Sequence, residues 1–398
     1  MEIEKLNEWN QWWEDKEFIN ELKGIDRPDY DYLLNSIDVK EITIITGVRR
    51  SGKSTLMYQM IDRLLKKRVE PVQILFVNLE DKKLSNNSLD EIYESYRENV
   101  NLDKKAYIFF DEIHKRDGWE SWIRKKYDLK TNTKFVISGS CSYLLKKEYS
   151  TLLTGRNLTF EVFPLGFWEY LMFKGIDADR NKIRRGILLG KTRFFILKSF
   201  DEYLNLGGFP EILFTPENYK RRLLEQYFND ILYKDIVDRY KINAQKTKDL
   251  ALFLITNFTG LISLRNLRNS LGLSYDAIKD YMSYFVEAFL FFTIDHFSYS
   301  LKEQKTLASK IYCIDNGLRN SVSFKFSKDE GKLVENLVLI ELKRRMEDVY
   351  YWKNKGEVDF VIKNKNQKLI AINVSFSDEV DEREINSLLE FKKEFKSK

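Results

Sequence analysis

A chain of 398 residues with 43% hydrophobic and 32% charged residues is long enough for two or three domains and too apolar for a disordered protein. Its 66 basic residues only slightly exceed its 61 acidic ones, so the net charge of +5 permits nucleic-acid binding without arguing for it. The two cysteines (Cys141, Cys313) and two histidines (His114, His296) argue against disulfides, structural zinc and a histidine-based metal centre. The most apolar stretch, 284–297, is too short to span a bilayer, and no N-terminal signal pattern is present, so we expect a soluble cytoplasmic protein without a membrane partner.

Residues 1–38 are predicted to be helical, with a break at Pro28. An apolar strand at 41–46 follows, and it runs directly into a glycine-rich loop and then a helix. The loop has the pattern G-x-x-x-x-G-K-[ST], which predicts phosphate binding. The residues expected to bind the nucleotide are Gly47, Val48, Arg49, Arg50, Ser51, Gly52, Lys53, Ser54 and Thr55.

Each part of this loop has a chemical task. Gly47 and Gly52 let the backbone wrap closely enough for its N–H groups to point at a phosphate. The helix N-terminus adds partial positive charge. Lys53 can reach the β- and γ-phosphates, and the hydroxyl of Ser54 can ligate Mg²⁺. The sequence therefore predicts ATP and Mg²⁺ as ligands.

Buried strands alternate with helices from Glu41 to Phe163, which indicates a parallel sheet with helices on both faces. The expected strands are 41–46, 73–79, 107–111, 134–138 and 157–163.

Asp111 and Glu112 follow the apolar strand at 107–110, which is a Walker B pattern. Ligands of α/β sheets bind at the carboxyl ends of the strands, where these acids are expected. Asp111 is predicted to hold Mg²⁺, and Glu112 is predicted to be the base that activates the attacking water.

Two further positions are candidates for the same site. The strand at 134–138 is expected to lie between the P-loop strand and the strand before Asp111, which would bring Ser138 or Ser140 beside the γ-phosphate. The alternative is an ordinary strand-to-loop turn. Arg156 either projects into the site of a neighbouring subunit and stabilises transition-state charge, or is an exposed surface arginine.

Five segments resemble, in their order, prokaryotic AAA-type P-loop ATPases, which are especially common in archaea and carry a C-terminal domain of unassigned function. They are GVRRSGKST, FFDEIH, ISGS, TGR and FPLGFWEY. The segments 203–211 and 232–237 fit as well, so the resemblance spans about 35–375. It implies ATPase activity, an α/β fold with an AAA-type sheet in the order 5-1-4-3-2, a helical lid, a winged helix and a restriction-endonuclease-like C-terminal domain.

The chain is divided accordingly into four parts. These are an ATPase core with an N-terminal helical extension (1–165), a helical lid (166–240), a winged helix (241–305) and a PD-(D/E)XK nuclease-like domain (306–398). In the lid, the turn at 207–210 suits a helix entry because Pro210 favours the first helical turn. In similar ATPases such a turn touches the adenine, so Pro210 is either a nucleotide contact or part of a plain helix entry.

The predicted winged helix is helix-turn-helix-like. Ser263 begins one helix, Gly272 ends it, and Ser274 begins the next, which runs over 275–288. This second helix carries three acids and a single lysine, whereas phosphate contacts normally come from lysine and arginine. The residues are Asp276, Asp280, Glu287 and Lys279. We therefore favour a packing or domain-coupling role over sequence-specific DNA reading.

The C-terminal part matches the nuclease pattern incompletely. Glu335 and Asp359 match its helix and strand carboxylates, but Asn373 and Ser375 stand where the pattern has a carboxylate and a lysine. A hard cation prefers anionic oxygens, so we expect a retained but degenerate site.

Three functions remain open from the sequence. The first is Mg²⁺-dependent ATP hydrolysis that couples the nucleotide state to movement of the lid and C-terminal domain, on DNA or in an oligomer. The second is a slow ATP-dependent switch that binds a protein partner. The third is a nuclease or DNA-processing factor.

Overall fold

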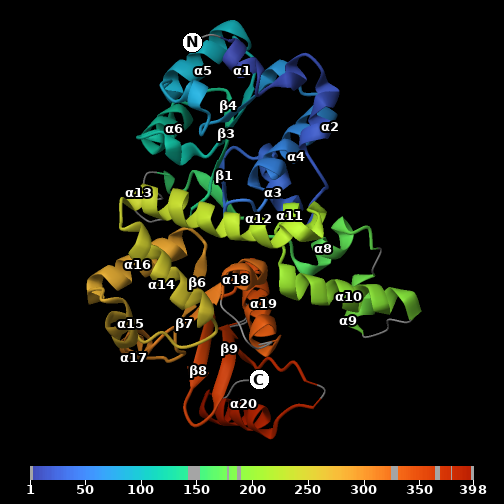
Figure 1. The fold of residues 1–398 in the computed structure, drawn as a ribbon. Helices are drawn as coiled ribbons and strands as arrows, with labels where there is room; N and C mark the ends of the chain where they lie inside the picture. The colour runs from blue at the N-terminus through green and yellow to red at the C-terminus, as the bar shows by residue number, and fades with distance from the viewer. Residues whose placement is uncertain are drawn as a thin grey trace. The chain divides into compact units, whose positions relative to one another are not determined.

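The computed structural model describes residues 3–141, 153–176, 179–185, 190–323, 330–363, 368–377 and 379–395. The chain forms two compact units, Met1–Val162 and Phe163–Lys398. The first unit is coloured blue to green in Figure 1, and the second is coloured green to red.

A five-stranded parallel sheet forms the centre of the first unit. Its strands are β1 (Ile42–Thr46), β2 (Ile74–Asn78), β3 (Ala106–Asp111), β4 (Thr133–Gly139) and β5 (Asn157–Glu161). Their order is β2-β3-β4-β1-β5, and every neighbouring pair is parallel. This confirms the α/β fold class and the expected sheet order, with β4 between the P-loop strand and the strand that ends at Asp111.

Both faces of this sheet are buried from β1 to β4 because apolar residues occupy both sides of these strands, whereas the edge strand β5 is half-buried. Ile42 and Ile44 join a core with residues of α5 (Leu89–Asn99) and α6 (Trp119–Asp128). Ile45 joins the opposite core, with α3 (Asp31–Asn35) and α4 (Lys53–Lys66). The two sets of helices cover opposite sides of the sheet in Figure 1. The alternation follows from the two-residue period of a strand.

The N-terminal segment is less regular than predicted. In place of extended helices it has α1 (Glu4–Asn7), α2 (Ile19–Leu22) and α3, joined by short 3₁₀ turns. Asn10 explains part of this, because its side chain donates to the carbonyl of Phe76 at 2.9 Å and accepts from the N–H of Phe76 at 2.7 Å. The segment thereby satisfies backbone groups on β2, one of the two edge strands of the sheet.

The second unit begins with a series of helices. They are α8 (Phe167–Phe173), α9 (Arg180–Arg184), α10 (Gly190–Leu206), α11 (Pro210–Phe214), α12 (Glu217–Asp230), a π-helical stretch (Ile231–Val237), α13 (Asp238–Tyr240), α14 (Ala244–Thr256), α15 (Leu264–Leu271) and α16 (Tyr275–Glu287). Ser263 and Ser274 cap α15 and α16 by accepting hydrogen bonds from backbone N–H groups, and Gly272 ends α15 with φ +60°. These predicted helix boundaries are confirmed.

Two small antiparallel sheets follow. β6 (Phe291–Ile294) pairs with β7 (Lys310–Cys313), and the order in the second sheet is β10-β9-β8. The remaining elements are α17 (Leu301–Thr306), α18 (Asn316–Val322), α19 (Glu330–Arg344), β8 (Val349–Lys353), β9 (Glu357–Lys363), β10 (Leu369–Ile372) and α20 (Glu382–Phe395). The helix α20 was not predicted from the sequence.

Within the described ranges, no helix combines the length and the apolar character that crossing a bilayer requires.

Candidate active site

The glycine-rich loop joins β1 to α4 in a conformation that only a few residues allow. Gly47 has φ +142°, Arg50 has φ +70° and Gly52 has φ +97°. A Cβ atom on Gly47 would lie 2.1 Å from the carbonyl oxygen of Val162, so this position requires glycine. The loop ends where α4 begins, at Lys53.

Lys53 is buried, and its ammonium group contacts the backbone at the start of the loop. Its Nζ atom donates to the carbonyl of Gly47 at 3.0 Å and to that of Val48 at 3.1 Å. The same atom lies 3.9 Å from Oε1 of Glu112. A positive charge is therefore fixed between the loop backbone and Glu112, which directly follows β3.

Asp111 connects the end of β3 to α4 and to β4 at the carboxyl edge of the sheet. One oxygen accepts a hydrogen bond from Ser54 Oγ at 2.6 Å, and the other accepts from the hydroxyl of Ser138 on β4. Burial disfavours the charged form and Glu112 adds a second negative charge nearby, so the pKa of Asp111 is raised above its ordinary value. Ser54, Asp111 and Ser138 thus form one hydrogen-bonded set.

Glu112 has a fixed orientation. Its backbone has φ +55°, its N–H donates to Ser138 Oγ at 3.1 Å, and its Oε2 accepts from the N–H of Ser140 at 3.0 Å. Nδ1 of His114 lies 3.4 Å from the same carboxylate. His114 was not predicted as part of the site, although its place two residues after Glu112 was a possible signal.

Glu80 is a second residue that sequence reasoning missed. It follows β2 and accepts from Arg49 of the loop at 2.9 Å, while Lys115 lies 3.4 Å away. Burial alone would raise the pKa of Glu80, but the two cations lower it to about 2. Its position after a parallel strand was the available signal.

The donor set fits a nucleotide with its magnesium ion. Mg²⁺ prefers oxygen ligands, often one or two carboxylates together with substrate phosphates. The hydroxyl of Ser54 and the carboxylate of Asp111 supply such oxygens 2.6 Å apart, beside the cation of Lys53 and the N-terminus of α4. The residues are therefore chemically suited to both ligands.

Two other predicted positions have partners of their own. Arg156 donates to Asp128 at 2.8 Å, so its action on a neighbouring subunit stays a prediction. Pro210 begins α11, and the preceding turn packs on Asp315, which accepts from the N–H of Gly208 at 2.7 Å. A Cβ on Gly207 would lie 1.9 Å from Asp315, which explains that glycine within the second unit. The adenine contact of Pro210 stays a prediction.

An acidic cluster in the second unit contains a lysine that the sequence pattern did not reveal. Nζ of Lys310 on β7 lies 2.7 Å from Glu357, 3.2 Å from Glu335 and 3.5 Å from Asp359. Burial alone would lower the pKa of Lys310, but the three carboxylates raise it above its ordinary value. Burial also raises the pKa of Glu335 to about 7.

The cluster does not use the position at which the nuclease pattern has its lysine. Ser375 stands at that position, is exposed and hydrogen-bonds Ser377 at 3.0 Å. A lysine from another strand enters the cluster instead. Among the described residues, no group of three or more histidine, cysteine, aspartate or glutamate side chains could hold a metal ion.

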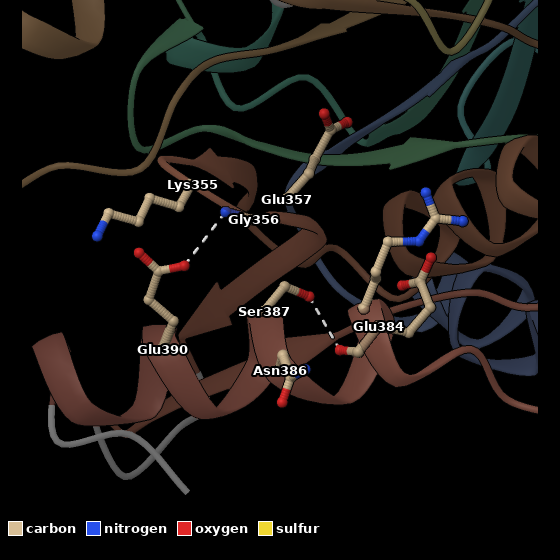
Figure 2. Close-up of a pocket in the computed structure, with 8 residues that line it drawn as sticks. Lys355, Gly356, Glu357, Glu384, Asn386, Ser387 and Glu390 are labelled. Atoms are coloured by element: carbon tan, nitrogen blue, oxygen red, sulfur yellow. Dashed lines mark hydrogen bonds between the residues drawn. The ribbon is translucent and has the colours of Figure 1, made fainter.

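Asn373 forms several hydrogen bonds beside this cluster. Its amide donates to Glu384 at 2.6 Å and to Ser387 at 2.9 Å, and its oxygen accepts from the N–H of Asp359 at 3.1 Å. The neighbouring cavity of about 510 Å³, shown in Figure 2, has side chains of both charges on its wall. It is lined by Lys355, Gly356, Glu357, Arg383, Glu384, Asn386, Ser387 and Glu390.

Known protein families match three consecutive parts of the chain. An AAA domain matches residues 39–171, which include the loop after β1 and the two acids at the end of β3, Asp111 and Glu112. Two domains of unknown function, DUF8612 and DUF4143, match residues 197–329 and 330–398. The parallel sheet, the loop and the two acids define an AAA-type P-loop domain.

Two curated relatives cover most of the chain. The uncharacterized protein MJ1544 of Methanocaldococcus jannaschii is 37% identical over 360 residues, which are 87% of this chain and 78% of that protein. An uncharacterized protein of Haemophilus influenzae is 29% identical over 382 residues, which are 94% of this chain and 92% of that protein. The chain belongs to the same family as MJ1544, and its N-terminal part is an AAA-type P-loop domain.

Solved structures show more distant likeness. The Aeropyrum pernix ORC1 protein in complex with DNA has a TM-score of 0.34 at 11% identity, over 79% of this chain and 96% of that one. AMPPCP-bound DnaA from Aquifex aeolicus has a TM-score of 0.26 at 12% identity, over 70% and 87% of the two chains.

Proposed function

We propose that this protein is a Mg²⁺-dependent ATPase. The observation that carries the proposal is the hydrogen-bonded set around Asp111, which joins Ser54 of the P-loop helix to Ser138 of the neighbouring strand. Glu112 shares Ser138 with Asp111 and lies 3.9 Å from Lys53. Phosphate-binding, metal-binding and proton-accepting groups are thus collected at one edge of the sheet.

The residues have separate roles in this proposal. Lys53 and the loop N–H groups bind the phosphates, and Ser54 and Asp111 hold the metal ion, which when bound neutralises phosphate charge. Glu112 orients a water molecule and accepts its proton. The N–H of Ser140 keeps the Glu112 carboxylate in place. A static nucleotide-binding site has no need for this second, firmly held carboxylate.

The test is release of inorganic phosphate from ATP and Mg²⁺ at several enzyme concentrations. We expect Lys53→Ala to lose nucleotide binding and Glu112→Gln to retain binding but lose turnover by about 10²-fold or more. Glu120→Gln is the matched control, because it alters a buried glutamate on α6 outside the hydrogen-bonded set. Hydrolysis that is undiminished in Lys53→Ala or Glu112→Gln would refute the assignment.

The same assay separates turnover from a slow switch. Tight retention of nucleotide through purification, with no measurable phosphate release by the wild-type protein, would favour a switch that binds a protein partner. Rapid turnover by the isolated protein would favour the ATPase.

We further propose that the second unit responds to the nucleotide through a helical lid (166–240), a winged helix (241–305) and a nuclease-like module (306–398). The helices α14, α15 and α16 followed by the strand β6 support the winged helix, and the partner strand β7 lies in the next part of the chain. Hydrogen exchange of Glu112→Gln with ADP and with ATP tests the response. Protection of the second unit that is identical in both states would contradict coupling.

DNA cleavage is a less favoured function. Lys310 sits among the carboxylates that a nuclease would use for its metal ion. DNA reading by α16 is also less favoured, because Asp276 and Asp280 are exposed on this helix and would repel phosphates. Glu287 is buried and accepts a hydrogen bond from Ser283 at 2.9 Å. We expect no plasmid cleavage with Mg²⁺ or Mn²⁺; a salt-dependent gel shift would instead reveal binding to the DNA backbone.

A further inference from the structure

The segment 23–30 of the N-terminal extension is fastened to the P-loop helix. Nε2 of Gln59 on α4 donates to the carbonyl of Lys23 at 2.9 Å and to that of Ile25 at 2.8 Å. Gly24 has φ +56°, and a Cβ there would lie 3.3 Å from Cγ2 of Thr55. The segment therefore runs directly against the first turns of α4.

Arg27 is the residue of this segment that reaches the loop itself. Its side chain is 2% exposed, and its Nη1 donates to the carbonyl of Ser51 at 2.8 Å. The guanidinium carbon lies 4.5 Å from the centroid of the Tyr30 ring, which supports its position. A buried, charge-assisted hydrogen bond thus holds one carbonyl of the phosphate-binding loop.

That carbonyl determines the direction of a neighbouring N–H group. The C=O of Ser51 and the N–H of Gly52 belong to the same peptide group. The described peptide bonds are all trans, so these two bonds lie in one plane and point in opposite directions. Because the oxygen points to Arg27, the N–H of Gly52 points away from Arg27. In a P-loop, backbone N–H groups of this kind surround the phosphates.

Glycine makes this orientation easy to lose. Gly52 has φ +97°, and glycine occupies both signs of φ readily, so the chain itself does little to prevent rotation of the Ser51–Gly52 peptide. Arg50 also has φ +70°, a value that is uncommon for a residue with a side chain. The loop conformation therefore depends on contacts from outside it.

We propose that Arg27 is a positioning residue for phosphate binding, which fixes the Ser51–Gly52 peptide so that the Gly52 N–H is available to the nucleotide. This inference rests on the proposed function, since it assumes that a nucleotide binds the loop. It gives the N-terminal extension a direct part in the nucleotide site. Arg27 acts through the backbone of Ser51 and does not itself touch the phosphates.

Titration calorimetry with Mg²⁺-ADP tests this role. We expect Arg27→Met to raise the Kd about tenfold, since a charge-assisted hydrogen bond that organises the site is lost. Arg27→Lys retains a cationic donor and should raise the Kd by less than about threefold. Lys23→Met is the matched control, because Lys23 lies in the same segment as Arg27 and its replacement removes an ion pair of 3.3 Å to Asp62 on α4, which should leave the Kd unchanged.

A second readout separates positioning from general stability. In protein labelled with ¹⁵N-glycine, the Gly52 amide signal should shift on addition of Mg²⁺-ADP in the wild type and in Lys23→Met, and the shift should be strongly reduced in Arg27→Met. A merely structural arginine would lower the melting temperature without changing the Kd or this shift at temperatures where the protein is folded.

The outcomes are distinguishable. If the wild type does not bind nucleotide, the proposed function fails. If the wild type binds and folded Arg27→Met binds equally well, the inference about Arg27 is wrong. If Arg27→Met does not fold, Arg27→Gln replaces it, and a Kd equal to that of the wild type would overturn the inference in the same way.

Discussion

At the scale of single residues, Asp111 combines a proposed metal-binding role with an environment that disfavours its charge. It is 2% exposed, and its pKa is raised because burial and the nearby charge of Glu112 disfavour the carboxylate. When folding raises the pKa of an acid, the stability that this acid contributes falls as the pH rises above the pKa that the acid has in the unfolded chain. The charge of Asp111 should therefore lower the stability of the nucleotide-free protein at neutral pH.

We predict that Asp111→Asn melts at a higher temperature than the wild type without nucleotide, by the equivalent of about 1 kcal/mol at pH ~7.5. The same variant should lose the additional stabilisation that ATP with Mg²⁺ gives the wild type. Differential scanning calorimetry with and without Mg²⁺-ATP measures both effects. A variant that is stabilised by Mg²⁺-ATP as much as the wild type would contradict the metal-binding role.

Asp315 allows a prediction of pH dependence. Its carboxylate accepts from Gly317 at 2.8 Å and from Gly208 at 2.7 Å, but burial raises its pKa to about 6. An unfolded aspartate titrates near pH ~4, so between about pH 4 and 6 the folded chain holds a proton that the unfolded chain has lost. The stability contributed by this group therefore falls as the pH rises through that window.

We predict that the free energy of unfolding of Asp315→Asn falls by about 2 kcal/mol less between pH 4 and pH 7 than that of the wild type. This prediction concerns the slope with pH and does not depend on how stable the variant is at any one pH. Urea unfolding of both proteins at pH 4, 5, 6 and 7 gives the comparison. Profiles that remain parallel over the whole range would show that the carboxyl group does not titrate in this window.

At the scale of secondary-structure elements, the sequence predicted what local patterns determine. The strands of the first unit are apolar runs bounded by polar residues, and the helices α15 and α16 begin at serine caps, so both were found. The short helices before β1 were predicted as more regular because their conformation depends on distant contacts such as that of Asn10 with Phe76. The helix α20 was overlooked.

The candidate site divides in the same way. Lys53, Asp111 and Glu112 lie in recognisable local motifs. Arg27, Glu80 and Lys310 do not, because each reaches its partners only after the chain has folded. The sheet order came from the family resemblance and could not have been obtained from strand patterns alone.

Lys310 on β7 is expected to stabilise the acidic cluster around it. Removing Lys310 leaves Glu335, Glu357 and Asp359 without the buried cation that separates them, so Lys310→Met should lose about 3 kcal/mol of stability. Burial raises the pKa of Glu335 to about 7 although Lys310 lowers it, so removing the lysine should raise this pKa further. Protonation of Glu335 should then relieve the repulsion at low pH, and the loss should be smaller at pH 5 than at pH 8.

The control for this variant is Lys353→Met, which removes an exposed ion pair of 2.8 Å to the same Glu357. Exposed pairs contribute little, so this protein should unfold close to the wild type in a denaturant titration. Equal stability of Lys310→Met and Lys353→Met at pH 8 would show that the buried lysine does not hold the cluster together.

At the scale of the whole molecule, Arg156 decides whether hydrolysis requires an assembly. If it acts on a neighbouring subunit, Arg156→Ala should reduce ATP turnover by about 10²-fold or more, and wild-type turnover per chain should rise with protein concentration. Arg124→Ala is the control, because Arg124 contacts the same Asp128 at 3.5 Å. Equal turnover by the two variants at all concentrations would leave Arg156 as a surface residue.

The central claim concerns a triphosphate at the loop after β1 and the two acids at the carboxyl end of β3, Asp111 and Glu112. A crystal structure of Glu112→Gln grown with ATP and Mg²⁺ tests it most directly, because the variant should bind the nucleotide without consuming it. We predict phosphates against the backbone of 47–55, with the metal ion bound by Ser54 and Asp111. Well-ordered crystals in which ATP lies elsewhere, or in which the side chains at positions 111 and 112 point away from the phosphates, would contradict the account.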